Sequence, residues 1–268
     1  MSEPALATAW EALRRPERSA FIAYLTAGFP DRKTSAAALR AAARHADVLE
    51  VGVPFSDPVA DGPVIQRASF EALAAGMSLQ GTLALIAESE LTCPVVLFSY
   101  LNPLLRYGLD RLLEDASDAG VSGLLITDLP AGADPATEAA VAASPLDLIP
   151  LVAPTTPGPR IRGIDAGATA FLYLIGRLGV TGPGAPPPAN LAEMVARTRA
   201  HAARPLAVGF GIATRRQVSA VAQVADGVVV GSALVQALGR GGVPALEEVL
   251  AELAPACARS PAEVVSHV

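Results

Sequence analysis

The chain has 268 residues, of which 51% are hydrophobic, and its net charge of −6 includes no basic block. This length suits one large domain, and the charge argues against nucleic acid as a partner. No apolar run reaches the roughly 18 to 20 residues of a membrane span, and the N-terminus lacks the pattern of a secretion signal, so we expect a cytoplasmic protein without membrane contact.

The first predicted element is an amphipathic helix over Ala5–Arg15, with Leu6 and Trp10 on one side. Eight short apolar runs follow, each of which ends in small or polar residues. These predicted strands are Phe21–Ala27, Val48–Val53, Val95–Tyr100, Gly123–Asp128, Leu148–Ala153, Phe171–Gly176, Leu206–Gly211 and Gly227–Gly231. Most of them are separated by stretches of helical period, such as Thr34–His45 and Arg106–Ala119.

Alternation of strands and helices, repeated eight times, predicts an α/β fold: a (β/α)8 TIM barrel that spans residues 1–268 as a single domain. The additional N-terminal helix is expected to plug the barrel's N-terminal end. A doubly wound sheet would need a Gly-rich turn after its first strand, and the segment found there, Gly28-Phe-Pro-Asp-Arg, does not match. The long gap between the second and third strands predicts extra structure, and the loop Arg177–Asn190 predicts a lid.

Two carboxylates, Glu50 and Asp61, carry the strongest chemical signal in the chain. Glu50 interrupts the apolar run Val48–Val53, where an ionised carboxylate costs several kcal/mol or shifts its pKa upward. Alternation places Glu50 on the face opposite Leu49 and Val51, so it points into the barrel mouth if those two face the helices. Asp61 follows at the end of a Pro- and Gly-rich loop. A buried acid with a second carboxylate nearby indicates proton-transfer catalysis.

Small residues at the ends of the last two strands indicate a phosphate site. Strand seven ends in Gly209-Phe-Gly-Ile212, and strand eight ends in Gly231-Ser-Ala233 before a helix. In barrels these two loops commonly bind phosphate. A third segment, Val180-Thr-Gly182, could fold onto the same anion. The alternative is that glycine here only relieves crowding in the barrel.

Large side chains at strand ends favour a flat, aromatic substrate, with ordinary core packing as the alternative. These side chains are Tyr24, Phe98, Tyr100 and Tyr173. The only lysine, Lys33, lies in a polar run, which disfavours Schiff-base and pyridoxal phosphate chemistry, and the three histidines are too scattered for a metal site. The residues therefore predict cofactor-free acid–base chemistry on a phosphorylated, aromatic substrate.

The segment Glu50–Gln66, which reads EVGVPFSDPVADGPVIQ, resembles the signature of the tryptophan synthase alpha chain family. Supporting segments lie in the right order over roughly residues 20 to 235. They include Tyr24-Leu-Thr-Ala-Gly28, Ser99-Tyr-Leu-Asn-Pro103 and Thr127-Asp-Leu-Pro130. The resemblance implies a lyase of tryptophan biosynthesis that cleaves indole-3-glycerol phosphate, by a retro-aldol reaction without a cofactor, into indole and glyceraldehyde 3-phosphate.

The resemblance also implies a role for each candidate residue. Glu50 would be the acid–base residue, and Asp61 would accept a hydrogen bond from the indole N–H and stabilise the protonated ring. The substrate-binding residues would be Tyr24, Phe98, Tyr100, Leu125, Tyr173 and Thr181. The phosphate-binding residues would be Gly182, Gly211, Ile212, Gly231 and Ser232. No metal site is implied.

Proteins of this family pair with a beta chain that carries pyridoxal phosphate, so the resemblance implies such a partner in an alpha2beta2 heterotetramer. Pro54–Pro58 and Asn102–Tyr107 would face it. The chain departs from the family at Gly176, where serine is usual, at Thr127, where many members have proline or alanine, and in the Pro-rich run Pro183–Pro188.

Two alternatives to an alpha chain in a complex stay open, and the altered loop after the sixth strand motivates the first. One is a stand-alone lyase that releases free indole. The other is a non-catalytic subunit that only activates its partner, although the presence of both acids argues against it. Another phosphate-binding barrel, such as an isomerase, would explain the ends of strands seven and eight but not the aromatic lining or the pair of acids.

Overall fold

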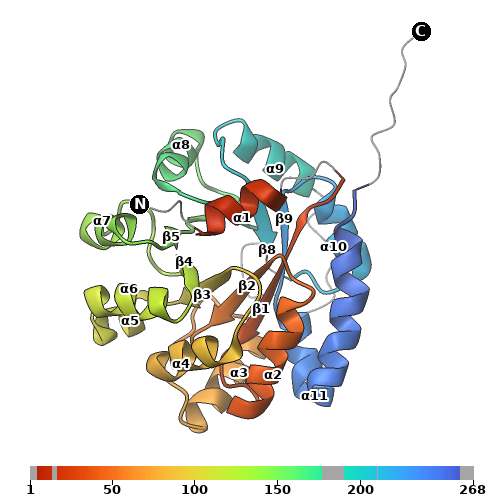
Figure 1. Cartoon of the computed structure of the whole chain (residues 1–268). Coiled ribbons are helices and arrows are strands. Elements are labelled where there is room, and N and C mark those ends of the chain that lie inside the picture. Colours follow the sequence, from red (N-terminus) through yellow and green to blue (C-terminus); the bar gives the residue numbers. More distant parts are fainter. Residues whose placement is uncertain (1–4, 14–16, 177–189, 210, 260–268) are drawn as a thin grey trace.

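The computed structural model describes residues 5–13, 17–176, 190–209 and 211–259 (Figure 1). Its strands are β1 (Ala20–Thr26), β2 (Val48–Gly52), β3 (Val95–Ser99), β4 (Val121–Ile126), β5 (Asp147–Leu148), β6 (Leu151–Val152), β7 (Leu172–Ile175), β8 (Leu206–Gly209) and β9 (Gly227–Val230). Its helices are α1 (Ala5–Leu13), α2 (Arg32–Ala43), α3 (Pro63–Ala74), α4 (Leu79–Ser89), α5 (Leu101–Tyr107), α6 (Leu109–Asp118), α7 (Pro135–Ala143), α8 (Gly158–Gly167), α9 (Leu191–Arg199), α10 (Arg215–Ala222), α11 (Ser232–Leu253) and the short 3-10 helix η1 (Ala254–Cys257).

The nine strands of the described residues form one parallel sheet in the order β5-β4-β3-β2-β1-β9-β8-β7-β6. The sheet curls into a barrel with helices on its outside (Figure 1). The two strands at the ends of this order are consecutive in the chain, because β5 pairs with β4 and β6 pairs with β7. The extended segment 147–152 thereby closes the barrel. The predicted TIM barrel is confirmed.

The predicted fifth strand, Leu148–Ala153, is wrong as one element, because it splits into β5 and β6. Pro150 lies at the split and has no backbone N–H to donate. Ile149 N donates to Leu124 O on the β4 side at 2.9 Å, whereas Tyr173 N on β7 donates to Pro150 O at 3.0 Å. Hydrogen bonding therefore changes from one neighbouring strand to the other at this dipeptide.

The predicted helix Arg106–Ala119 is also wrong as one element. It breaks at Gly108, whose φ of +94° lies in the region that favours glycine. Helix α5 ends at the residue before this glycine, and α6 begins at the residue after it. The short helix α5 thus becomes a separate element that follows β3 directly.

Two helices, α3 and α4, occupy the long gap between β2 and β3, which confirms the extra structure predicted there. Helix α3 begins directly after Asp61, with Gly62 as its N-cap and Pro63 in its first turn. No helix of the described residues is by itself long and apolar enough to cross a membrane. Helices α3 and α4 meet the criteria of length and composition only as a pair that is bent by 95°.

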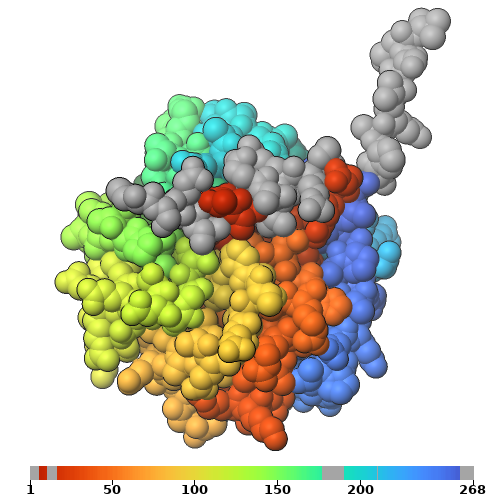
Figure 2. Space-filling view, viewed as in Figure 1, coloured from red at the N-terminus to blue at the C-terminus, as the bar shows by residue number. Residues whose placement is uncertain are grey.

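Helix α1 plugs the N-terminal end of the barrel, as predicted. Leu6 is fully buried, and the ring of Trp10 stacks on Phe171 with a centroid distance of 4.5 Å. A Cβ atom at Gly227, on β9, would lie 2.9 Å from the Trp10 ring, so the indole fills the space that this glycine leaves. Figure 1 and the space-filling view in Figure 2 both show α1 lying over this face.

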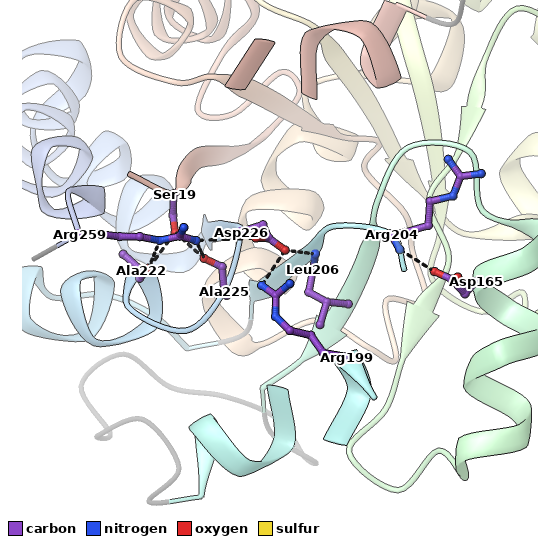
Figure 3. A network of polar contacts seen from close by, with 9 residues as sticks. All are labelled: Ser19, Asp165, Arg199, Arg204, Leu206, Ala222, Ala225, Asp226 and Arg259. Carbon is purple, nitrogen blue, oxygen red and sulfur yellow. Dashed lines mark hydrogen bonds and ion pairs between the residues drawn. The ribbon is translucent and has the colours of Figure 1, made fainter. Parts of the chain in front are cut away.

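A polar network around Asp226 ties this end of the barrel to the segment after η1 (Figure 3). One Asp226 oxygen accepts hydrogen bonds from Leu206 N and from the Arg199 guanidinium, each at 2.8 Å. The Arg259 guanidinium lies 3.7 Å from the other oxygen and also donates to Ala225 O at 2.7 Å. One carboxylate therefore joins β8, α9 and the last described segment of the chain.

We expect Asp226→Ala to lower the free energy of unfolding by about 2 kcal/mol, because it leaves a buried N–H and two guanidinium groups without their acceptor. Chemical denaturation of the purified protein measures this change. Glu88→Ala is the control, since it removes an ion pair with Arg32 in which both side chains are exposed (44% and 62%), and such pairs contribute little. Equal losses in the two variants would contradict this role of Asp226.

Candidate active site

A cavity lies at the carboxyl ends of the strands. Its described lining comes from six strands or the loops after them, and from the first turns of α3 and α11. The lining residues are Tyr24, Glu50, Asp61, Gly62, Ile65, Phe98, Tyr173, Gly211, Val229, Gly231 and Ser232. No lysine, arginine or histidine is among them. Two carboxyl groups therefore dominate the electrostatics of the described lining.

Glu50 lies in the middle of β2, in register with Tyr24 on β1 and Val96 on β3. Its side chain is fully buried and points into the barrel, as the alternation predicts. Neither of its carboxyl oxygens has a hydrogen-bond partner among the described residues. Burial raises the pKa of Glu50 from its ordinary 4.5 to about 8. The group is therefore mostly a neutral acid at pH 7.

Asp61 lies at the end of the loop after β2 and is also buried. Burial raises the pKa of its carboxyl group, and a hydrogen bond from the Tyr100 hydroxyl lowers it, with a net pKa of about 6. Asp61 is therefore mostly ionised at pH 7. One cavity therefore holds both a neutral acid and an ionised carboxylate. Acid–base catalysis requires this difference, because one group must donate a proton while the other carries a negative charge.

Two tyrosines line the cavity, and each hydroxyl occupies space that a glycine leaves open. A Cβ atom at Gly52 would lie 2.1 Å from the Tyr24 hydroxyl, and one at Gly209 would lie 1.9 Å from the Tyr173 hydroxyl. Burial is the main reason why the pKa of each tyrosine is raised well above its usual value, so both are neutral. The ring of Phe98 meets that of Tyr24 edge-on, at a centroid distance of 5.1 Å. The aromatic side chains form a largely apolar wall.

Gly211, Gly231 and Ser232 line the cavity near the start of α11, whose first residue is Ser232. The free N–H groups of a helix's first turn carry partial positive charge and favour an anion. The first turn of α11 holds no acidic residue that would oppose one. Gly211 has a φ of +81°, which favours glycine and allows the backbone to come close to a ligand. These groups suit a phosphate.

Some predicted site residues lie elsewhere. Leu125 and Ile212 are buried but do not line the cavity, and neither does Tyr100. Thr181 and Gly182 fall outside the described residues, as do nearly all of the predicted lid Arg177–Asn190 and the whole of Pro183–Pro188. Their assignments stay predictions.

Three lining residues escaped the sequence analysis: Gly62, Ile65 and Val229. Ile65 is an apolar residue in the first turn after Asp61, and Val229 lies two residues before Gly231 on the same face of its strand. Both positions could have been predicted from the sequence, by counting along the predicted strand and along the first turn of the helix.

A larger hollow lies outside the barrel, between α7 and α8. Most of its lining is apolar, and its two charged side chains already bind backbone groups: Glu138 accepts from Gly132 N, and Arg160 donates to Ala131 O. This hollow lacks a buried pair of carboxyl groups, so the smaller cavity is the better candidate for the site of chemistry. Among the described residues, no group of three or more His, Cys, Asp or Glu side chains is placed to hold a metal ion.

Comparison with known proteins identifies one family. The family model for the tryptophan synthase alpha chain matches residues 10–260. A curated tryptophan synthase alpha chain from Desulfosudis oleivorans is 42% identical over 91% of this chain and 93% of its own length. One from Gloeobacter violaceus is 43% identical over 94% of this chain and 92% of its own length.

Solved structures give the same picture. A chain of Mycobacterium tuberculosis tryptophan synthase superimposes with a TM-score of 0.89 and 37% identity, and the match covers 97% of this chain and 100% of that one. A mutant tryptophan synthase alpha-subunit from Pyrococcus furiosus gives a TM-score of 0.79 and 34% identity, with coverage of 88% and 98%. The similarity extends over almost the whole length of each chain.

The buried Glu50 should make stability depend on pH. Above pH 4.5 the unfolded chain releases the proton, while the folded chain keeps it up to about pH 8, so the wild type loses stability over this range. Glu50→Gln does not titrate, and we expect it to be more stable than the wild type by about 2 kcal/mol at pH 7. Urea denaturation between about pH 5 and pH 8 measures the difference, which should widen as pH rises. A constant difference would contradict the buried acid.

Proposed function

The chain belongs to the tryptophan synthase alpha chain family, and we propose that Glu50 and Asp61 perform its chemistry in the cavity at the barrel mouth. The chain is a lyase that cleaves indole-3-glycerol phosphate to indole and glyceraldehyde 3-phosphate in tryptophan biosynthesis. One observation supports the residue assignment above all: a neutral buried acid and an ionised carboxylate line the same small cavity.

Glu50 is the proton carrier in this proposal. Its neutral carboxyl group donates a proton to indole C3, and the ring becomes a cation. The resulting carboxylate then takes the proton of the hydroxyl on the adjacent side-chain carbon. The electron pair of the former O–H bond forms the carbonyl of the aldehyde. The carbon–carbon bond breaks at the same time, and its electrons restore the neutral indole. Glu50 ends protonated, and the protonated ring serves as the electron sink. General acid–base catalysis of this kind contributes about 10² to 10⁴ in rate.

Asp61 stabilises the charged intermediate. Its carboxylate accepts a hydrogen bond from the indole N–H, and this interaction strengthens when C3 protonation makes the ring cationic. Because the interaction is stronger in the transition state than in the ground state, it raises the rate rather than only the affinity.

The rest of the cavity binds and orients the substrate. Tyr24, Phe98 and Tyr173 offer aromatic surface to the indole ring. Gly231 and Ser232, at the start of α11, hold the phosphate together with Gly211. Binding energy from the phosphate, remote from the bond that breaks, positions the ring against the two carboxyl groups.

The related solved chain belongs to a tryptophan synthase, and we propose that a beta chain docks beside the cavity of this chain. Two apolar side chains near the cavity mouth are exposed: Val59 by 80% and Leu105 by 50%. Val59 directly follows the predicted contact segment Pro54–Pro58, and Leu105 lies within Asn102–Tyr107. Exposed apolar side chains at such a place favour a protein partner. Pyridoxal phosphate would reside in that partner.

We expect Glu50→Gln to lower kcat by at least about a hundredfold, because the amide cannot carry a proton. Substrate affinity should change by only a few-fold, since the shape of the side chain is kept. Stopped assays of indole release give the rate, and calorimetric titration gives the affinity. Glu138→Gln, the same change in the hollow outside the barrel, is the control and should keep wild-type turnover. Turnover retained in Glu50→Gln would exclude it as the proton carrier.

We expect Val59→Asp to weaken binding of a beta chain by at least about tenfold, because it places a charge in an apolar contact. Calorimetric titration with a purified beta chain measures the affinity, and its activation of indole release gives a second readout. Ala139→Asp, an exposed position on α7, makes the same change of charge away from the cavity. If both variants bind alike, the docking surface lies elsewhere. If the wild type binds no beta chain and is not activated by it, the chain works alone.

A further inference from the structure

Tyr100 was predicted to contact the substrate, but it does not line the cavity. It is buried at the N-cap of α5, directly after β3. Its hydroxyl meets the loop that ends in Asp61: Ala60 N donates a hydrogen bond to the hydroxyl oxygen at 2.9 Å. The hydroxyl also lies near enough to the Asp61 carboxyl group to lower its pKa. The bond to Ala60 N therefore holds the loop at the residue before Asp61.

The chemistry of a hydroxyl group decides the direction of these bonds. A tyrosine hydroxyl has a single proton and can also accept. Since the Ala60 N–H can only donate, it uses the oxygen as an acceptor and leaves the proton for Asp61.

The surroundings of Tyr100 keep this hydroxyl in place. Its ring packs against Phe55 at a centroid distance of 5.0 Å. The next residue, Leu101, donates its N–H to Asp128 at 2.7 Å, which fixes the backbone where α5 begins. On the other side, the Gln66 amide donates to Asp61 O at 3.0 Å. The loop is thus held at Asp61 O from α3 and at Ala60 N from the start of α5.

We propose that Tyr100 is a positioning residue for Asp61: through its hydrogen bond with Ala60 N it holds the loop so that the Asp61 carboxylate can receive the indole N–H. This inference rests on the role that the proposed function gives to Asp61. Tyr100 acts through that carboxylate rather than on the bond that breaks.

The protonation of Asp61 reports on this contact. Four titratable groups face or share its pocket: Tyr24 on β1, Glu50 on β2, Tyr173 on β7 and Tyr100. The first three are neutral near pH 7. Burial raises the pKa of Asp61, and the hydrogen bond from Tyr100 lowers it. Loss of the hydroxyl therefore raises that pKa, so a smaller fraction of Asp61 is ionised on the acid side of neutrality.

The test compares Tyr100→Phe with Thr34→Val in the full chain. Thr34 lies in the first turn of α2, and its hydroxyl also donates to an aspartate, Asp31, at 2.6 Å, but on the surface. In Tyr100→Phe we expect kcat at pH 7 to fall about tenfold, KM to stay within about threefold, and the acid limb of kcat/KM to move up by about one pH unit. Thr34→Val should match the wild type in all three.

A double-mutant cycle with Asp61→Asn gives the second readout. If Tyr100 acts through the carboxylate, Tyr100→Phe should lower kcat no further once Asp61 is replaced. An acid limb that stays in place, or losses that multiply in the double variant, would overturn the inference. Failure of the proposed function is distinct, because the wild type itself would then not release indole.

Discussion

A carboxyl group buried without a hydrogen-bond partner is the constraint on which the rest of this molecule depends. Glu50 lies on a strand that pairs on both sides, with β1 and with β3, so the register fixes which way its side chain points. It cannot turn outward without moving Leu49 and Val51, which are fully buried. The barrel holds the carboxyl group in an apolar environment, which raises its pKa and keeps it protonated.

Asp61 shows how a similar group behaves in a different setting. It belongs to a loop rather than to a strand, and the loop returns to the barrel where a hydroxyl group is available. Burial raises the pKa of Asp61 as it raises that of Glu50, whereas the Tyr100 hydroxyl lowers it. Two carboxyl groups of similar intrinsic acidity thereby acquire different charges in one cavity. A hydroxyl group from a distant part of the chain contributes to this difference.

Local patterns predicted the barrel and the acids, since they depend on near neighbours in sequence. The alternation around Glu50 gave its orientation, and counting along the strands placed Tyr24 and Tyr173 in the cavity. The break at Gly108 and the split at Pro150 were missed, although both residues were visible, because a helical or apolar pattern runs through them. The placement of Tyr100 was out of reach, because it depends on where a loop some 40 residues earlier in the chain returns.

The two ends of the barrel's chain meet in the folded protein. Ser19 N donates to Cys257 O at 2.9 Å, Arg259 N donates to Glu17 O at 2.8 Å, and β1 pairs with β9. The first and last strands of the barrel are therefore neighbours that hydrogen bonds, rather than a peptide linkage, hold together. It follows that the fold does not depend on which strand comes first in the chain. A circular permutant, joined across this seam and opened at an exposed turn such as Gly132, would keep every strand pairing and bring the same two acids to the same mouth.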